Sequence, residues 1–237
     1  MTARILKKRE EIDLSRNALR RLGASCLPAW PIPALRRLGI LPGVNLGDRV
    51  KSWDILTTAT FLLERLPRNA PILDIGAYAS EILPAMHRLG YSSLSGVDLN
   101  PGVRRMPHSD VIRYEVADFM RTPFGDGSFD AVTSISVIEH GFDPQRLLAE
   151  ISRLLRPGGY FLSSFDYWPE KVDTTGVRIF GMDWTIFSRG EVLDFLSVAR
   201  GYALQPDGDL DLDAGDKVIH WGGKEYTFGW LALRKTS

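Results

Sequence analysis

The feature that most constrains this chain is an apolar segment ending in a glycine turn, followed by a second apolar segment ending in an acid. The first reads Ile-Leu-Asp-Ile-Gly-Ala-Tyr-Ala-Ser over residues 72–80, and the second reads Gly-Val-Asp-Leu-Asn over residues 96–100. Two short buried strands joined through a helix predict a parallel sheet, whose carboxyl edge is where α/β proteins bind ligands. Gly76 permits a tight turn at that edge, and Asp98 can accept hydrogen bonds from ribose hydroxyls. The pattern predicts a site for a nucleotide-like ligand.

The glycine turn differs from the dinucleotide fingerprint G-x-G-x-x-G, because Tyr78 and Ser80 stand where further glycines are expected. These side chains would crowd a pyrophosphate but not a ligand without phosphates, which argues against a nicotinamide-dependent oxidoreductase. The sequence also has no G-x-S-x-G elbow and no G-x-x-x-x-G-K-S/T loop. Hydrolase and P-loop functions therefore lack support.

The amino-acid composition argues against several further classes of protein. The 237 residues include 29 Lys plus Arg and 29 Asp plus Glu, so the formal net charge is zero, which argues against a bulk nucleic-acid binder. Cys26 is the only cysteine and the four histidines are scattered, so we expect no disulfide and no metal site. The chain has no apolar run of membrane-spanning length and no signal-peptide pattern, so we expect a cytoplasmic protein without stable membrane insertion.

Two regions are expected along the chain. Residues 1–50 are predicted to form a helical extension or lid, and residues 51–237 the main α/β domain. In the extension, residues 1–25 predict an amphipathic helix with Ile5, Ile12, Leu19 and Leu22 on one face, and residues 26–47 predict an irregular linker rich in proline and glycine. This helix would pack on the domain or on a second copy in a homodimer. A membrane-surface role, suggested by Arg20, Arg21, Arg36 and Arg37, is the alternative.

The main domain shows short apolar strands that alternate with helices. The expected strands cover residues 72–75, 94–99, 111–116, 129–134, 160–165 and 225–234. The expected helices begin at Ser52, Glu81, Asp143 and Ser188, and they end near Leu66, Leu89, Leu155 and Gly201. Ser52 and Asp143 are expected to cap their helices, and Ser188 is expected to form a capping box with Glu191. Such alternation predicts a doubly wound, mostly parallel sheet.

Polar residues follow the later strands as well. Asp118 and Phe119 come after the third strand, and an acid beside an aromatic ring suits the edge and face of adenine. Glu139 and His140 follow the fourth strand, and either can accept a proton near neutral pH, although His140 would equally serve a structural hydrogen bond. Candidates for an acceptor pocket, with core packing as the alternative for the aromatic ones, are Ser164, Asp166, Tyr167, Trp168, Trp184 and Trp221.

Read in order, the motifs of residues 50–165 resemble the class I S-adenosylmethionine-dependent methyltransferases, in particular those of type 11. The motifs are Leu-Asp-Ile-Gly (73–76), Val-Asp (97–98), Ala-Asp-Phe (117–119), Pro-Phe-Gly-Asp-Gly-Ser-Phe-Asp (123–130), Ile-Glu-His (138–140) and Leu-Leu-Arg-Pro-Gly-Gly (154–159). The resemblance implies a Rossmann-like doubly wound sheet of seven strands, with the last strand antiparallel. It also implies S-adenosylmethionine as cofactor.

The resemblance assigns roles by position. Asp74 and the turn Gly76-Ala77-Tyr78 would frame the methionine part of the cofactor, and Asp98 would hold the ribose hydroxyls. Adenine would lie among Leu99, Asp118 and Phe119, while Ser134 and Ile135 would line the pocket through their backbone. A similar sub-branch, with K-S-W before D-I-G-A-Y, is associated with sugar or surface-polysaccharide pathways. There Lys51 or Trp53 would reach the cofactor, with Lys51 on its carboxylate.

The function expected from the sequence is methyl transfer to a small-molecule hydroxyl, with a sugar, nucleotide sugar or polysaccharide component as acceptor. A sugar hydroxyl is a poor nucleophile, so His140 or Glu139 is the candidate base. One alternative is a methyltransferase acting on nitrogen, carbon or a carboxyl group. Another is a noncatalytic protein that keeps the fold, which a Tyr78 side chain filling the cofactor groove would favour. Nucleic-acid methylation is not expected, since the charge is balanced and no N-P-P-Y-type motif is present.

Overall fold

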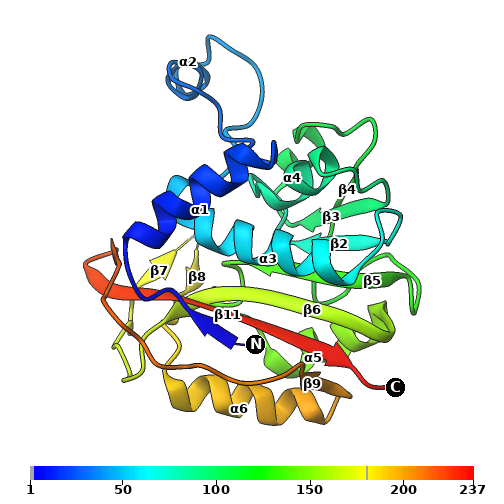
Figure 1. Cartoon of the computed structure of the whole chain (residues 1–237), viewed down its shortest axis with the longest axis vertical. Coiled ribbons are helices and arrows are strands. Elements are labelled where there is room, and N and C mark those ends of the chain that lie inside the picture. Colours follow the sequence, from blue (N-terminus) through cyan, green and yellow to red (C-terminus); the bar gives the residue numbers. More distant parts are fainter. Residues whose placement is uncertain (1–2, 180) are drawn as a thin grey trace. The chain divides into compact units, whose positions relative to one another are not determined.

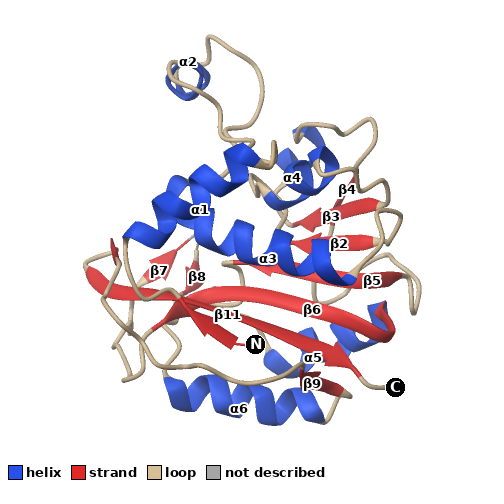
Figure 2. Ribbon diagram, viewed as in Figure 1, coloured by secondary structure: helices blue, strands red, loops and turns tan. Residues whose placement is uncertain are grey.

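The computed structural model describes residues 3–179 and 181–237. The chain forms two compact units, one of Met1–Glu11 with Phe124–Ser237 and one of Ile12–Pro123. Figures 1 and 2 show the elements of each unit along the chain. The division predicted at residue 50 stays a prediction.

The unit of residues 12–123 is built on three parallel strands in the order β2-β3-β4. These strands are β2 (Ile72–Ile75), β3 (Leu94–Asp98) and β4 (Arg113–Val116). All four residues of β2 are buried, as expected for a strand with neighbours on both faces. Its helical elements are α1 (Glu10–Arg21) from Ile12 onward, α2 (Ile32–Arg37), η1 (Arg49–Lys51), α3 (Ser52–Arg65), α4 (Ile82–Arg88) and η2 (Pro101–Arg105).

The unit that contains residues 124–237 carries a sheet in the order β1-β11-β6-β5. Its strands are β1 (Ala3–Ile5), β5 (Phe129–Ile135), β6 (Leu155–Tyr167) and β11 (Lys224–Lys235), and the short strands β9 (Leu204–Pro206) and β10 (Ile219–Trp221) also pair with β11. β5 and β6 are parallel, whereas β11 runs antiparallel to β6. The remaining elements are α5 (Pro144–Leu154), α6 (Arg189–Arg200) and the hairpin of β7 (Arg178–Ile179) with β8 (Met182–Asp183).

The predicted fold class is confirmed, because the strands are largely parallel and the final long strand is antiparallel. The predicted main-domain elements lie where they were expected, with ends that differ by a few residues. Ser188 and Glu191 form the capping box that the sequence indicates at the start of α6. No helix in the described part of the chain is long and apolar enough to span a bilayer.

Three local predictions are wrong. The single helix expected over residues 1–25 is a strand, β1, followed by α1, because residues 3–5 pair with the edge of β11 (residues 1 and 2 lie outside the described part). Leu22 is consequently exposed rather than on the buried face. The linker of residues 26–47 contains the short helix α2. Ser52 does not cap α3, since Lys51 stands at that position and the Ser52 hydroxyl binds Arg16 instead.

Candidate functional site

The turn after β2 is tied to the end of β3 by two backbone donors. Gly76 has a φ of +71°, a left-handed conformation that favours glycine. The Ala77 N–H donates to the carbonyl of Val97 at 3.0 Å, and the Tyr78 N–H donates to Oδ2 of Asp98 at 2.9 Å. The glycine turn and the acid that the sequence singled out therefore form one structure.

Asp98 keeps the capacity to hold a ligand. The backbone N–H of Asn100 donates to its Oδ1 at 2.7 Å, and Tyr78 occupies one position on Oδ2. An ionised carboxylate offers about four acceptor positions, so two remain for a pair of vicinal hydroxyls. The side chain is half-buried, and the neighbouring Leu99 is exposed. This donor and acceptor chemistry fits the ribose of S-adenosylmethionine.

Tyr78, which replaces a glycine of the usual turn, packs against the segment after β3. A Cβ atom added at Gly102 would lie 2.6 Å from Cε2 of the Tyr78 ring, so the ring fills the space that this glycine leaves. Asn100 holds the same segment by accepting the Gly102 N–H at 2.8 Å. The ring of Tyr78 is thus accommodated by a second glycine, Gly102, in the segment after β3.

Asp74 and Gly96 are paired in the strands that lead to the turn and to Asp98. Asp74 is fully buried in β2 and pairs in register with Gly96 of β3. A Cβ at Gly96 would lie 2.8 Å from the Cβ of Ala77 and 2.9 Å from the Tyr114 ring, so only glycine allows this close packing. Burial raises the pKa of the Tyr114 hydroxyl, and the charge of Asp74 raises it further.

The end of β4 lies beside the end of β3. The Ala117 N–H donates to the carbonyl of Asp98 at 3.1 Å, which brings the Ala117-Asp118-Phe119 segment next to the acid. Oδ1 of Asp118 accepts the Met120 N–H at 2.8 Å, and both Asp118 and Phe119 are half-buried. The structure therefore places the predicted ribose and adenine residues at adjacent strand ends.

Lys51 and Trp53 lie where η1 joins α3. Lys51 is half-buried at the last position of η1, and Trp53 is 7% exposed in the first turn of α3. Their predicted contacts with the cofactor stay predictions.

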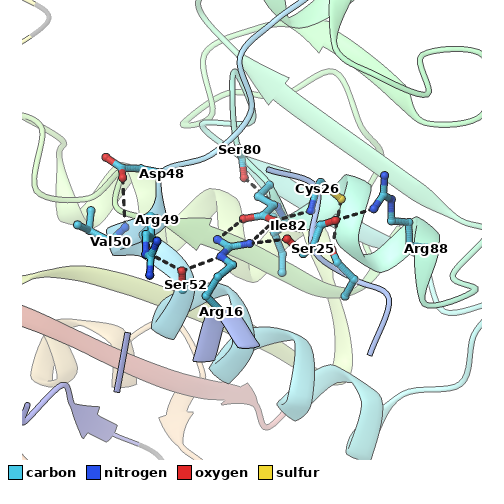
Figure 3. Close-up of polar contacts among 12 residues, drawn as sticks. Arg16, Ser25, Cys26, Asp48, Arg49, Val50, Ser52, Ser80, Ile82 and Arg88 are labelled. Carbon is cyan, nitrogen blue, oxygen red and sulfur yellow. Dashed lines mark hydrogen bonds and ion pairs between the residues drawn. The ribbon is translucent and has the colours of Figure 1, made fainter. Parts of the chain in front are cut away.

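A buried ion pair below the glycine turn was not anticipated from the sequence. Arg16 of α1 donates through Nη1 and Nη2 to the two carboxylate oxygens of Glu81 at 2.7 and 2.8 Å, and both side chains are 1% exposed. Glu81 also accepts the Cys26 N–H at 2.7 Å, and Arg16 donates to the hydroxyls of Ser25 and Ser52 (Figure 3). The available signal was the position of Arg16, four residues after Ile12 and three before Leu19, on the apolar face of the helix.

The candidate catalytic pair lies in the other unit, after β5. Ser134 is buried and Ile135 half-buried at the end of the strand. Glu139 is 1% exposed and its carbonyl accepts the Thr185 N–H at 2.8 Å, while His140 is half-buried and forms a β-bridge with Trp184. The backbone thus fixes both residues against Trp184 and Thr185.

The same unit brings together three of the acceptor-pocket candidates. Trp184 is buried and donates through its indole N–H to Oδ2 of Asp166 at 2.8 Å. Its ring meets that of Trp221 edge-on, with centroids 5.3 Å apart, and Trp221 remains half exposed. Trp184 is therefore a core residue, whereas Trp221 presents an aromatic face to solvent.

Comparison with solved structures bears on the fold. Over 95% of its length the chain superposes on a geranyl diphosphate C-methyltransferase from Streptomyces coelicolor, crystallised with S-adenosyl-L-homocysteine, with a TM-score of 0.59, 17% identity and 98% coverage of that protein. This likeness shows that the chain has the fold of the class I methyltransferases.

The family is indicated by the sequence comparison. Residues 73–163 match the family model described as a methyltransferase domain, so the resemblance to the class I S-adenosylmethionine-dependent methyltransferases is confirmed for this region. An uncharacterised methyltransferase of Mycobacterium sp. (strain KMS) is 36% identical over 109 residues, which are 44% of this chain and 42% of that protein. A ubiquinone biosynthesis O-methyltransferase of Xanthomonas oryzae is 32% identical over 109 residues, which are 43% of this chain and 45% of that protein. The chain thus matches less than half the length of these two relatives.

Proposed function

We propose that this protein binds S-adenosylmethionine and transfers its methyl group to a hydroxyl of a small molecule. The observation that carries the proposal is the hydrogen bond from the Tyr78 N–H to Asp98, which joins the glycine turn to a carboxylate with free acceptor capacity. The match of residues 73–163 to the methyltransferase domain model supports it.

The residues of the turn and strand ends would hold the cofactor. Asp98 would accept hydrogen bonds from the ribose hydroxyls, and Gly76 would allow the backbone to approach the methionine part. Asp118 and Phe119 would bind the edge and face of adenine, and Leu99 would contact it. When bound, the cofactor supplies a methyl group already activated by the positive sulfur. The chain would then chiefly need to align the acceptor with this methyl group and to exclude water.

The acceptor proposed is a sugar, a nucleotide sugar or a polysaccharide component. The half-exposed ring of Trp221, held edge-on by the buried Trp184, offers an apolar face of the kind that packs on sugar rings. The name of the Xanthomonas oryzae relative, an O-methyltransferase, supports a hydroxyl as the receiving group. His140 or Glu139 would take the proton that the hydroxyl loses.

Calorimetric titration with S-adenosylmethionine tests the cofactor. We expect saturable binding to the unchanged protein. Asp98→Ala should weaken binding by about 10- to 100-fold, since hydrogen bonds to a charged group are lost. Asp110→Ala removes an exposed acid of the same unit and should leave the affinity unchanged. No binding at millimolar ligand would refute the proposal and favour the noncatalytic alternative.

Methylation assays with labelled cofactor test the acceptor and the base. Nucleotide sugars and glycans should become labelled, with phenols and amines as comparison acceptors. His140→Ala or Glu139→Gln should slow turnover while cofactor affinity stays nearly intact. If neither change slows turnover, neither residue is the base, and an acceptor that needs no base, such as an amine, is favoured instead.

A further inference from the structure

Positive charge is concentrated in the residues that run from within α1 to the end of the loop that follows it. Residues 14–47 contain no acidic residue and five arginines, of which Arg16 is buried against Glu81, in a chain whose net charge is zero. Within this segment, the loop of residues 27–46 holds α2 and stands clear of α1 and α4 (Figure 1). The positive charge of residues 14–47 is therefore a local property, which the zero net charge of the whole chain conceals.

The loop exposes large apolar side chains on both sides of α2, which lies at the far end of the loop, so we call residues 30–40 its tip (Figure 1). Trp30 is 84% exposed, Leu38 73% and Ile40 63%, and Trp30 and Leu38 are the two most exposed large apolar side chains among the described residues. A set of this kind on one short loop is uncommon on a soluble surface and marks an interaction site.

The loop is folded before it meets any partner. The Arg36 guanidinium donates to the carbonyls of Pro42 and Val44 at 3.2 and 2.8 Å, and the Asn45 amide donates to the carbonyl of Pro33 at 3.2 Å. At the tip, the Leu38 N–H donates to the carbonyl of Ala34 at 3.0 Å, and the Ile40 N–H to that of Leu35 at 2.9 Å. The N–H groups of Leu38 and Ile40 are thus hydrogen-bonded within the loop. Moving them out of water therefore breaks no hydrogen bond and costs little free energy.

Both ends of the loop are fixed at the same place. The Cys26 N–H donates to the Glu81 carboxylate at 2.7 Å, and the Gly47 N–H donates to the carbonyl of Ala79 at 2.7 Å. Glu81 is held in turn by Arg16 (Figure 3). The loop therefore projects from a rigid base directly beside the glycine turn.

We propose that the loop of residues 27–46 docks the protein peripherally on an anionic lipid bilayer. An indole with two aliphatic side chains at the tip suits the headgroup boundary, where Trp partitions and apolar side chains enter the acyl region. The exposed arginines of the segment, Arg20, Arg21 and Arg37, meet anionic headgroups, and residues 14–47 hold no acid to oppose them. This charge complementarity favours a bilayer over an apolar protein surface, and the proposal goes beyond methyl transfer.

Co-sedimentation of the full chain with vesicles tests the proposal. We expect binding to vesicles of phosphatidylglycerol and phosphatidylcholine at low salt, weaker binding at high salt, and little binding to pure phosphatidylcholine. The triple change Trp30→Ser, Leu38→Ser and Ile40→Ser should abolish the binding. A matched control, Val111→Ser with Leu193→Ser, removes exposed apolar side chains elsewhere and should bind as before.

A variant without the exposed arginines tests whether positive charge contributes to binding. Arg20→Gln, Arg21→Gln and Arg37→Gln together should weaken binding to the anionic vesicles by about 100-fold, at about fivefold for each arginine. Calorimetry with S-adenosylmethionine on all variants shows whether the cofactor site is intact, so failure of docking is separable from failure of the proposed function. Unchanged vesicle binding by the triple serine variant would overturn the proposal. The proposal would also be overturned if the unchanged protein bound no vesicles but self-associated, and if the triple serine variant did not self-associate. The tip would then contact a second copy of the chain.

Discussion

Removing one member of the buried Arg16–Glu81 pair should strongly destabilise the unit of residues 12–123. Both side chains are 1% exposed, and the Glu81 carboxylate receives two guanidinium donors and the Cys26 N–H. Arg16→Met keeps much of the volume of the side chain but leaves the carboxylate with the single backbone donor. Breaking a buried pair in this way costs about 3–5 kcal/mol of unfolding free energy.

Urea denaturation followed by far-ultraviolet circular dichroism measures this loss. With a denaturant dependence of about 3 kcal/mol per molar, the midpoint should fall by about 1–2 M. Arg49→Met is the matched control, because its pair with Asp13 is more than half exposed on both sides and should leave the midpoint nearly unchanged.

The double variant Arg16→Met with Glu81→Gln separates the pair from the packing around it. The amide introduced by Glu81→Gln keeps an acceptor for the Cys26 N–H but carries no charge, so about 1–3 kcal/mol of the loss should be recovered. If Arg16→Met shifts the midpoint no more than Arg49→Met, or if the double variant loses the sum of its single changes, the reasoning is refuted.

Three further outcomes are expected. Gly102→Ala should displace the Tyr78 ring, whose Cε2 would lie 2.6 Å from the new Cβ, and weaken cofactor binding in calorimetry. In a Tyr78→Gly background the same change should weaken binding less, because only the contact with Oδ1 of Asn100 at 3.0 Å remains. Burial raises the pKa of the Cys26 thiol to about 11, so alkylation by iodoacetamide should be slow at pH 8 and accelerate as the pH approaches that value; a fast reaction at pH 8 would contradict it. Ser188→Ala removes the cap that binds the Glu191 N–H and should cost about 1 kcal/mol in urea denaturation.

Much of the fold was predictable because it depends on residues that are neighbours in the chain. The run of residues 72–75 is apolar apart from Asp74 and forms β2 with the predicted bounds. The Asp143-Pro144 pair starts α5, and Ser188 starts α6, since a cap needs only the next three residues. In the candidate site, the alignment of Gly76 with Asp98 follows from parallel pairing, which places strand ends at one edge.

Other features could not be predicted, because they depend on contacts between distant segments. β1 exists because residues 3–5 pair with β11, and the sequence there is equally compatible with a helix. The Tyr78 departure looks obstructive in the sequence, yet Gly102 provides the space that its ring occupies. The roles proposed for Lys51 and Trp53 rest on resemblance, whereas those of Glu139 and His140 rest on their position after a strand and on their ability to accept a proton.

The sequence by itself therefore determined the order of strands and helices, the glycine turn and the acid at the end of β3. Each of these follows from hydrophobic periodicity and turn chemistry within a few residues. Only the tertiary structure decided that Arg16 is buried, because an arginine on an apolar helix face can enter the interior only when a partner such as Glu81, 65 residues away, neutralises it there. The same carboxylate also accepts the Cys26 N–H and so fixes the base of the 27–46 loop.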